Sequence, residues 1–197
     1  MNDHEILAHD LAVLEAMVAF TEPYLISDVT QWDMGRPGMP SMTLGGILMR
    51  RHRLMRLGDL LDEEERARLA EANESFDRVV ADRVVRLEQR ANVELQARMR
   101  EWTHYLRDLT SRVAARPEHY RHVADTRVVI GHLVDLLSRP PYRLDAHVPD
   151  DVAACDRRLR ADWSPGEFIW SSVWEPAYLR ETYWWLYGSP RPHVHPT

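Results

Sequence analysis

The longest regular pattern of hydrophobic and polar positions lies between Gly58 and Gly131, where the sequence contains no other glycine. Proline interrupts this stretch only at Pro117. Because glycine and proline are the residues that most often end a helix, the stretch favours one long helix. Asp62 and Glu65 match a capping box, which predicts that the helix begins just after Asp62.

The apolar residues of this predicted helix, residues 63–114, recur at a spacing of eleven residues. This spacing corresponds to about 3.67 residues per turn, close to that of an α-helix, so the apolar residues share one face. Acidic residues lie four positions before arginines on the opposite face, which keeps that face polar and helical. We call the apolar face the apolar stripe; it consists of Leu69, Phe76, Val80, Val84, Leu87, Ala91, Leu95, Trp102, Leu106, Leu109 and Val113.

The length of this helix sets a constraint on the whole molecule. A helix over residues 63–114 is about 78 Å long, whereas a compact domain of 197 residues is roughly 40 Å across. The helix therefore breaks, or the protein is elongated, or a second chain covers the apolar stripe. A break is expected near Ala91–Asn92, where the stripe is thinnest. Asn73 is a polar residue on the same face of the helix, and it either fixes the pairing register or sits near an exposed helix start.

Shorter patterns flank the long one. Amphipathic periodicity and Pro117, which suits the first turn of a helix, predict further helices. We expect an all-α fold, an elongated helical bundle in which shorter helices pack on the long central helix. The bundle domain is expected to cover residues 1–162, and an aromatic-rich extension residues 163–197. The shorter helices are predicted at residues 6–20, 44–57, 117–137 and 151–162.

The C-terminal extension has the most unusual composition. Aromatic side chains offer a large contact area, and tryptophan and tyrosine dominate the energetically important positions of protein interfaces. The extension is therefore predicted to dock a protein partner or to pack back on the bundle as ordinary core. The candidate partner-binding residues are Trp163, Phe168, Trp170, Trp174, Tyr178, Trp184 and Trp185.

Charge narrows the possible partners. All 25 basic residues are arginine, and the formal net charge is −6, which argues against a general nucleic-acid-binding protein. One local basic cluster, a candidate phosphate-binding site, consists of Arg50, Arg51, Arg53 and Arg56. The alternative is that these arginines form a solvated face or pair with the acidic residues after Gly58.

The single cysteine, Cys155, excludes an internal disulfide and any site with several cysteine ligands. The longest uncharged apolar run, residues 128–134, is far shorter than the roughly 20 residues that cross a membrane. The first residues are acidic and lack a basic segment, so a secretory signal is not expected. We expect a cytoplasmic protein without a membrane span.

Histidine spacing raises the possibility of a metal site. Glu101 and His104 form one E-x-x-H pair, and His119 and His122 lie three residues apart. Di-iron bundles use two E-x-x-H pairs and two further glutamates, and only one such pair occurs in this sequence. A metal-binding helical bundle is therefore kept as an alternative, and no cofactor is expected.

Arg127 and His132 form an R-x-x-x-x-H pattern within a predicted helix. The pattern resembles the active motif of HEPN ribonucleases, which are small α-helical, often dimeric proteins of toxin and defence systems. The resemblance covers six residues, and Val128 stands where the family commonly has a polar residue. It implies that Arg127 stabilises the charge of an RNA phosphate and that His132 acts as acid or base, without a metal.

The apolar stripe and the aromatic extension together favour a non-catalytic function. We expect a helical interaction or assembly subunit that self-associates or docks a protein partner. The alternatives are the HEPN-like ribonuclease and the metal-binding bundle. Nucleic acid is a less favoured partner than protein, and the sequence contains no glycine-rich phosphate loop or nucleophile elbow that indicates another enzyme class.

Overall fold

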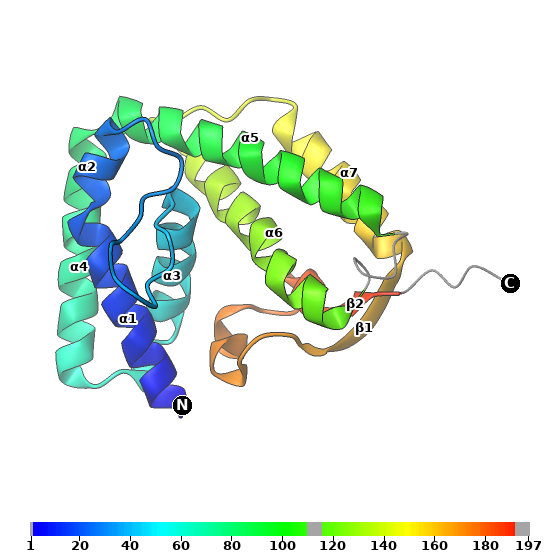
Figure 1. The fold of residues 1–197 in the computed structure, drawn as a ribbon, viewed down its shortest axis with the longest axis horizontal. Helices are drawn as coiled ribbons and strands as arrows, with labels where there is room; N and C mark the ends of the chain where they lie inside the picture. Colours follow the sequence, from blue (N-terminus) through cyan, green and yellow to red (C-terminus); the bar gives the residue numbers. More distant parts are fainter. Residues whose placement is uncertain (1, 110–115, 192–197) are drawn as a thin grey trace, which may run out of the picture.

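Helices make up most of the chain, which confirms the predicted all-α class (Figure 1). The computed structural model describes residues 2–109 and 116–191. None of the helices in these two ranges has the length and apolar character that a bilayer crossing demands. The helices are α1 (Asp3–Ala19), α2 (Thr21–Ile26), α3 (Leu44–Arg56), α4 (Glu63–Asp82), α5 (Val84–Asp108), α6 (Pro117–Leu137) and α7 (Val148–Ala161). Short 3-10 helices lie at Gly58–Leu60, Ser172–Ala177 and Trp184–Leu186, and strands at Trp163–Phe168 (β1) and Tyr187–Pro190 (β2).

The predicted helix over residues 63–114 is not continuous, because the chain changes direction at Arg83 (Figure 1). Its start is confirmed: Asp62 and Glu65 form the predicted capping box at the N-terminus of α4. The expected break near Ala91–Asn92 is wrong, since both residues lie inside α5. The α2 helix packs at the corner, where Arg83 pairs with Glu22 at 2.5 Å. Residues 110–114 of the predicted helix lie outside the described ranges.

Apart from the half-buried Val84, the described residues of the apolar stripe are covered within the same chain. Phe76, Leu87 and Trp102 are buried in one continuous hydrophobic core. Asn73 accepts a hydrogen bond from Nε of Arg51 in α3 at 2.7 Å, so its partner also belongs to this chain. The break at Arg83 allows both halves of the stripe to reach this core, which resolves the conflict between helix length and domain size.

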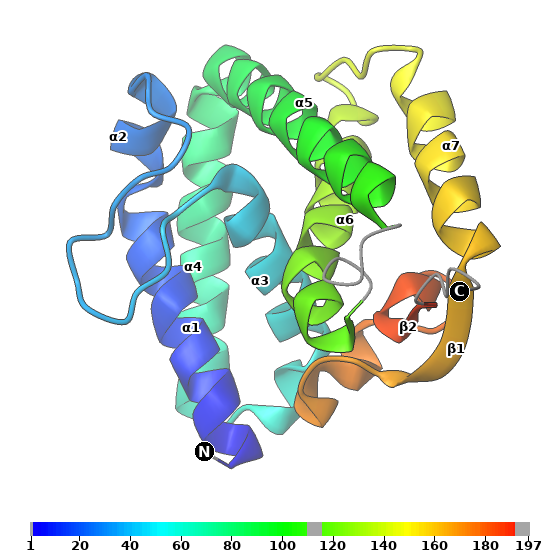
Figure 2. The same ribbon diagram turned by 45° about the vertical axis from the view of Figure 1, so that its right-hand side comes forward.

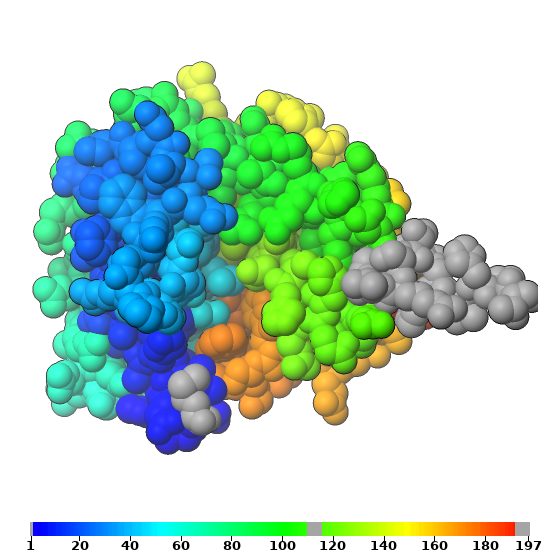
Figure 3. Space-filling view, in the orientation of Figure 1, coloured from blue at the N-terminus to red at the C-terminus, as the bar shows by residue number. Residues whose placement is uncertain are grey.

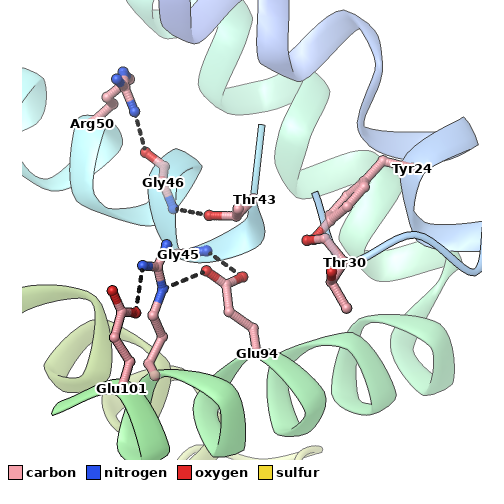
Figure 4. Close-up of polar contacts among 9 residues, drawn as sticks. Tyr24, Thr30, Thr43, Gly45, Gly46, Arg50, Glu94 and Glu101 are labelled. Atoms are coloured by element: carbon pink, nitrogen blue, oxygen red, sulfur yellow. Dashed lines mark hydrogen bonds and ion pairs between the residues drawn. The ribbon is translucent and has the colours of Figure 1, made fainter. Parts of the chain in front are cut away.

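The α3 helix lies between α1 and α6 and is fixed at its N-terminus. Oε2 of Glu94, in α5, accepts a hydrogen bond from the Gly45 amide at 3.0 Å, and Oγ1 of Thr43 accepts one from the Gly46 amide at 3.0 Å (Figure 4). A Cβ atom at Gly45 would lie 2.2 Å from Cγ1 of Val129 in α6. Glycine at this position therefore sets how closely α3 and α6 approach each other.

A buried ionic network joins α3 to α1. The guanidinium of Arg53 makes two hydrogen bonds to the Asp10 carboxylate, and Arg50 lies 3.3 Å from the same carboxylate. Trp174 covers the Arg53 guanidinium at 4.0 Å from the ring centre. A buried charge is tolerated only when it is paired and hydrogen-bonded, so this network fixes the orientation of α3.

The C-terminal segment wraps around the ends of α3 and α6, and Figure 3 shows it in orange between α1 and α6. Strands β1 and β2 pair antiparallel, with Trp163 opposite Pro190, below α7 in Figure 2. The hydroxyl of Tyr120, in α6, donates to the Trp185 carbonyl at 2.6 Å. The segment therefore contributes side chains to the same core as the helices.

Candidate functional site

Two histidines from different helices meet at one end of the bundle core. His52 lies in α3 and His132 in α6, and their ring centres are 4.7 Å apart with the planes inclined at 48°. Tyr183 of the C-terminal segment lies beside both rings, at 5.7 Å from His52 and 6.5 Å from His132. Three segments that are far apart in the sequence thus build one site.

Hydrogen bonds define the state of the His52 ring. Its Nε2 lies 2.9 Å from the carbonyl oxygen of Ala177 and 3.4 Å from the Tyr183 hydroxyl. A carbonyl oxygen only accepts, so Nε2 carries the proton and Nδ1 keeps its lone pair. The C-terminal segment therefore fixes which nitrogen of His52 is an electron-pair donor.

The His132 ring is less well satisfied. Its Nε2 atom is buried, yet it has no hydrogen-bond partner among the described residues. Leaving a buried polar atom without a partner costs about 1–3 kcal/mol, and native proteins contain few such atoms. Of the eight buried side-chain atoms without a hydrogen-bond partner among the described residues, this nitrogen is the one whose residue lines the cavity beside His52.

Burial keeps both rings uncharged at neutral pH. Loss of hydration, together with a smaller contribution from the neighbouring His52, lowers the pKa of His132 to about 4 against the opposing effect of Asp135. Loss of hydration also lowers the pKa of His52, where the hydrogen bond to Ala177 opposes the change and Arg56 reinforces it. Both imidazoles are therefore neutral lone-pair donors.

The two rings line a cavity of about 450 Å³ between α3, α4, α6 and the loop after α6. We call it the histidine cavity. Two ion pairs stand at its edge: Arg51 with Asp77 at 2.8 Å, and Arg139 with Asp135 at 2.6 Å. These four charges cancel in pairs. The rest of the wall is mainly apolar and includes Leu48, Met55, Phe76, Val80, Leu136 and Tyr142.

The arginine of the HEPN-like pattern makes contacts that differ from those of its histidine. The Arg127 guanidinium forms two hydrogen bonds of 2.8 Å to Asp156 in α7 and lies over the Trp185 ring at 4.1 Å. His132 instead contacts His52 and Tyr183. The structure therefore does not pair Arg127 with His132 within this chain.

The predicted basic cluster is directed largely inward. Arg53 is buried, and Arg50 and Arg51 have side chains that are only 13% and 16% exposed. All three pair with carboxylates of the same chain, whereas Arg56 is exposed. The cluster thus holds α3 in place and leaves mainly Arg56 for an external phosphate.

The candidate metal ligands are not gathered into one site. Glu101 pairs with Arg98 at 3.2 Å, and His104 pairs with Asp108 at 3.2 Å. His119 lies beside the Tyr105 ring, and His122 is exposed. Within residues 2–109 and 116–191, the group with suitable ligand spacing is His4, Asp62 and Glu65, whose two carboxylates already form the α4 capping box.

The predicted partner-binding aromatic residues contact one another and the bundle. Trp163, Tyr178 and Trp185 are buried. Trp174 covers Arg53, and Trp184 covers Arg160 at 3.8 Å. The remaining two, Phe168 and Trp170, are partly buried against the same core. Much of the aromatic surface is therefore used inside the chain.

No pattern in the sequence predicts that His52 and His132 lie next to each other. His52 stood among arginines, and His132 was singled out only for its spacing from Arg127. Comparison with protein-family models, with curated proteins and with solved structures gave no match.

Proposed function

We propose that the protein binds a small organic molecule in the histidine cavity. The observation that carries this proposal is the buried Nε2 atom of His132, which lacks a partner although its ring lines a cavity. A ligand that supplies a hydrogen-bond donor would remove the cost of this unsatisfied atom. Binding in this way requires a small rotation of the His132 ring toward the cavity, because Nε2 has almost no accessible surface in the free protein.

The form of the cavity supports this proposal. Its volume of about 450 Å³ lies in the range of small-molecule sites, which are mostly apolar and have a few convergent polar groups. Its two imidazoles are held by helices, and His52 is oriented further by the Ala177 carbonyl. Rigid elements that hold polar groups in place reduce the entropy lost on binding.

The predicted assembly function stays a prediction, with less support than the sequence suggested. Its main argument was that some other surface must cover the apolar stripe, and apart from Val84 the described residues of the stripe belong to the hydrophobic core of this chain or pack against it. The HEPN-like function also stays a prediction, and in this chain Arg127 is engaged by Asp156. The contacts of His52 and His132 therefore favour ligand binding over either alternative.

A fragment titration tests the proposal. Neutral, anionic and cationic fragments are added to the full chain, and binding is followed by nuclear magnetic resonance. Val80 lines the cavity, so V80W should fill it and abolish binding. The matched control V85W places the same ring on an exposed part of α5 and should leave binding intact. Fragments that bind both variants equally, or no binding to the wild type, would refute the proposal.

A further inference from the structure

We infer that the ligand of the histidine cavity is an uncharged aromatic molecule with a hydroxyl donor, of the phenol class. This inference rests on the proposed function and specifies its ligand. It follows from three properties of the cavity: the balance of charge at its edge, the protonation state of the histidines, and the side chains that form its wall.

The charge balance disfavours a strongly charged ligand. Arg51 is neutralised by Asp77, and Arg139 by Asp135. The two histidines add no charge at neutral pH, because burial lowers the pKa of each. An anion that approaches either arginine meets the paired carboxylate beside it, and a cation that approaches either carboxylate meets the paired arginine, so neither gains a net attraction. An uncharged ligand enters without breaking either pair.

The histidines require a donor. A neutral imidazole presents one unprotonated nitrogen, which accepts a hydrogen bond. The unsatisfied Nε2 of His132 is such an acceptor when its proton resides on Nδ1. A phenolic hydroxyl is more acidic than an aliphatic one and therefore donates a stronger hydrogen bond to this nitrogen.

The wall favours a flat aromatic body. Met55 lines the cavity with 61% of its surface exposed, and a thioether makes favourable contacts with an aromatic ring. Nη2 of Arg139 donates both hydrogen bonds to Asp135, and Arg139 lines the cavity, so the face of its guanidinium can stack on a ligand ring. Tyr142 and Leu136 complete the apolar wall. An aromatic ring uses all of these contacts, whereas a linear aliphatic chain does not.

Phenol and three matched compounds test the inference on the full chain at pH 7. Anisole lacks the donor, cyclohexanol lacks the ring, and benzoate carries a negative charge. Phenol should bind about fivefold or more tightly than anisole, the difference expected for one buried hydrogen bond. Cyclohexanol and benzoate should bind more weakly than phenol. Affinities are obtained from the chemical shifts of residues around the cavity.

His132→Leu isolates the hydrogen bond. It removes the acceptor but keeps an apolar side chain, so phenol should lose its advantage over anisole while anisole binds as before. The control H104L changes an exposed histidine of α5 and should preserve the phenol preference. Equal binding of phenol and anisole to the wild type, or tighter binding of benzoate, would overturn the inference. In that case the proposed function stands if benzoate or other fragments bind the wild type but not V80W. It is refuted if they also bind V80W.

Discussion

His132 places a titratable ring where it is largely removed from water, although one side of the ring lines the histidine cavity. Its neighbours are His52 on α3, Asp135 on its own helix, and Tyr183 of the C-terminal segment. Burial disfavours the protonated ring more than Asp135 favours it, so the pKa falls from 6.5 to about 4. The residue therefore reduces stability in acid, which is a cost typical of groups kept for binding or catalysis.

The pH dependence of unfolding follows from this shift. Between pH 6.5 and pH 4 the unfolded chain binds a proton at His132 that the folded chain does not, so stability falls as the pH falls. His132→Leu removes this loss. The free energy of unfolding of H132L minus that of the wild type should therefore rise by about 2 kcal/mol when the pH is lowered from 7 to 5. Urea titrations of both proteins at both pH values measure this difference. A difference that is independent of pH would contradict the lowered pKa of His132.

Removal of the buried carboxylate of Asp10 should destabilise the protein. D10A leaves the charges of Arg50 and Arg53 without their partner, so the free energy of unfolding should fall by about 3–5 kcal/mol. The control E15A, on the same helix, breaks a pair with Arg68 that is partly exposed and should cost about 1 kcal/mol or less. Urea titrations of the two variants make the comparison. Similar losses in both would show that the buried network does not hold α3.

At the scale of elements, the approach of α3 to α6 determines the distance between the two histidines. The close contact lies at Gly45 and Val129, about two helical turns from His52 in α3 and one turn from His132 in α6. A change in this contact should therefore alter both stability and ligand binding.

Two glycine substitutions test this approach. G45A places a Cβ atom 2.2 Å from Val129 Cγ1, so we expect a loss of about 1–3 kcal/mol and weaker fragment binding. G131A, within α6, places its Cβ atom 3.5 Å from Nη1 of Arg127 and should stabilise the helix by about 0.5–1 kcal/mol. Thermal unfolding and the fragment titration measure both effects. Stabilisation by G45A would contradict the close packing of the two helices.

Local signals predicted much of the element order. The Asp62–Glu65 capping box and Pro117 mark helix starts that the structure confirms. The end of α4 had no such signal, because the residues around Arg83 contain neither glycine nor proline. The break there coincides with α2 packing at the corner and with the Glu22 ion pair, which are tertiary contacts that periodicity does not encode.

At the scale of the whole molecule, the C-terminal segment completes both the core and the candidate site. Ala177 binds His52, and Trp185 accepts a hydrogen bond from Tyr120. These contacts join positions more than 60 residues apart in the sequence. The aromatic residues were recognisable as a contact surface, but neither their target nor the pairing of the two histidines could be predicted from spacing.

Such contacts predict one cooperative unfolding transition. Most of the tryptophans lie in residues 163–185, so their fluorescence reports mainly on the C-terminal segment, whereas far-ultraviolet circular dichroism reports on the helices. The two signals should give the same midpoint and slope in urea. An earlier fluorescence transition would mean that residues 163–190 unfold separately from the bundle.

The most direct measurement is the long-range proton–nitrogen spectrum of the histidine rings, recorded at pH 7 with and without phenol and assigned with H52Q and H132L. We predict that both rings are neutral, that His52 carries its proton on Nε2, and that the unprotonated nitrogen of His132 has the shift of a free acceptor until phenol moves it. A protonated His132, or a ring nitrogen that phenol leaves unchanged at saturation of the fragment signals, would contradict the assignment of the ligand site.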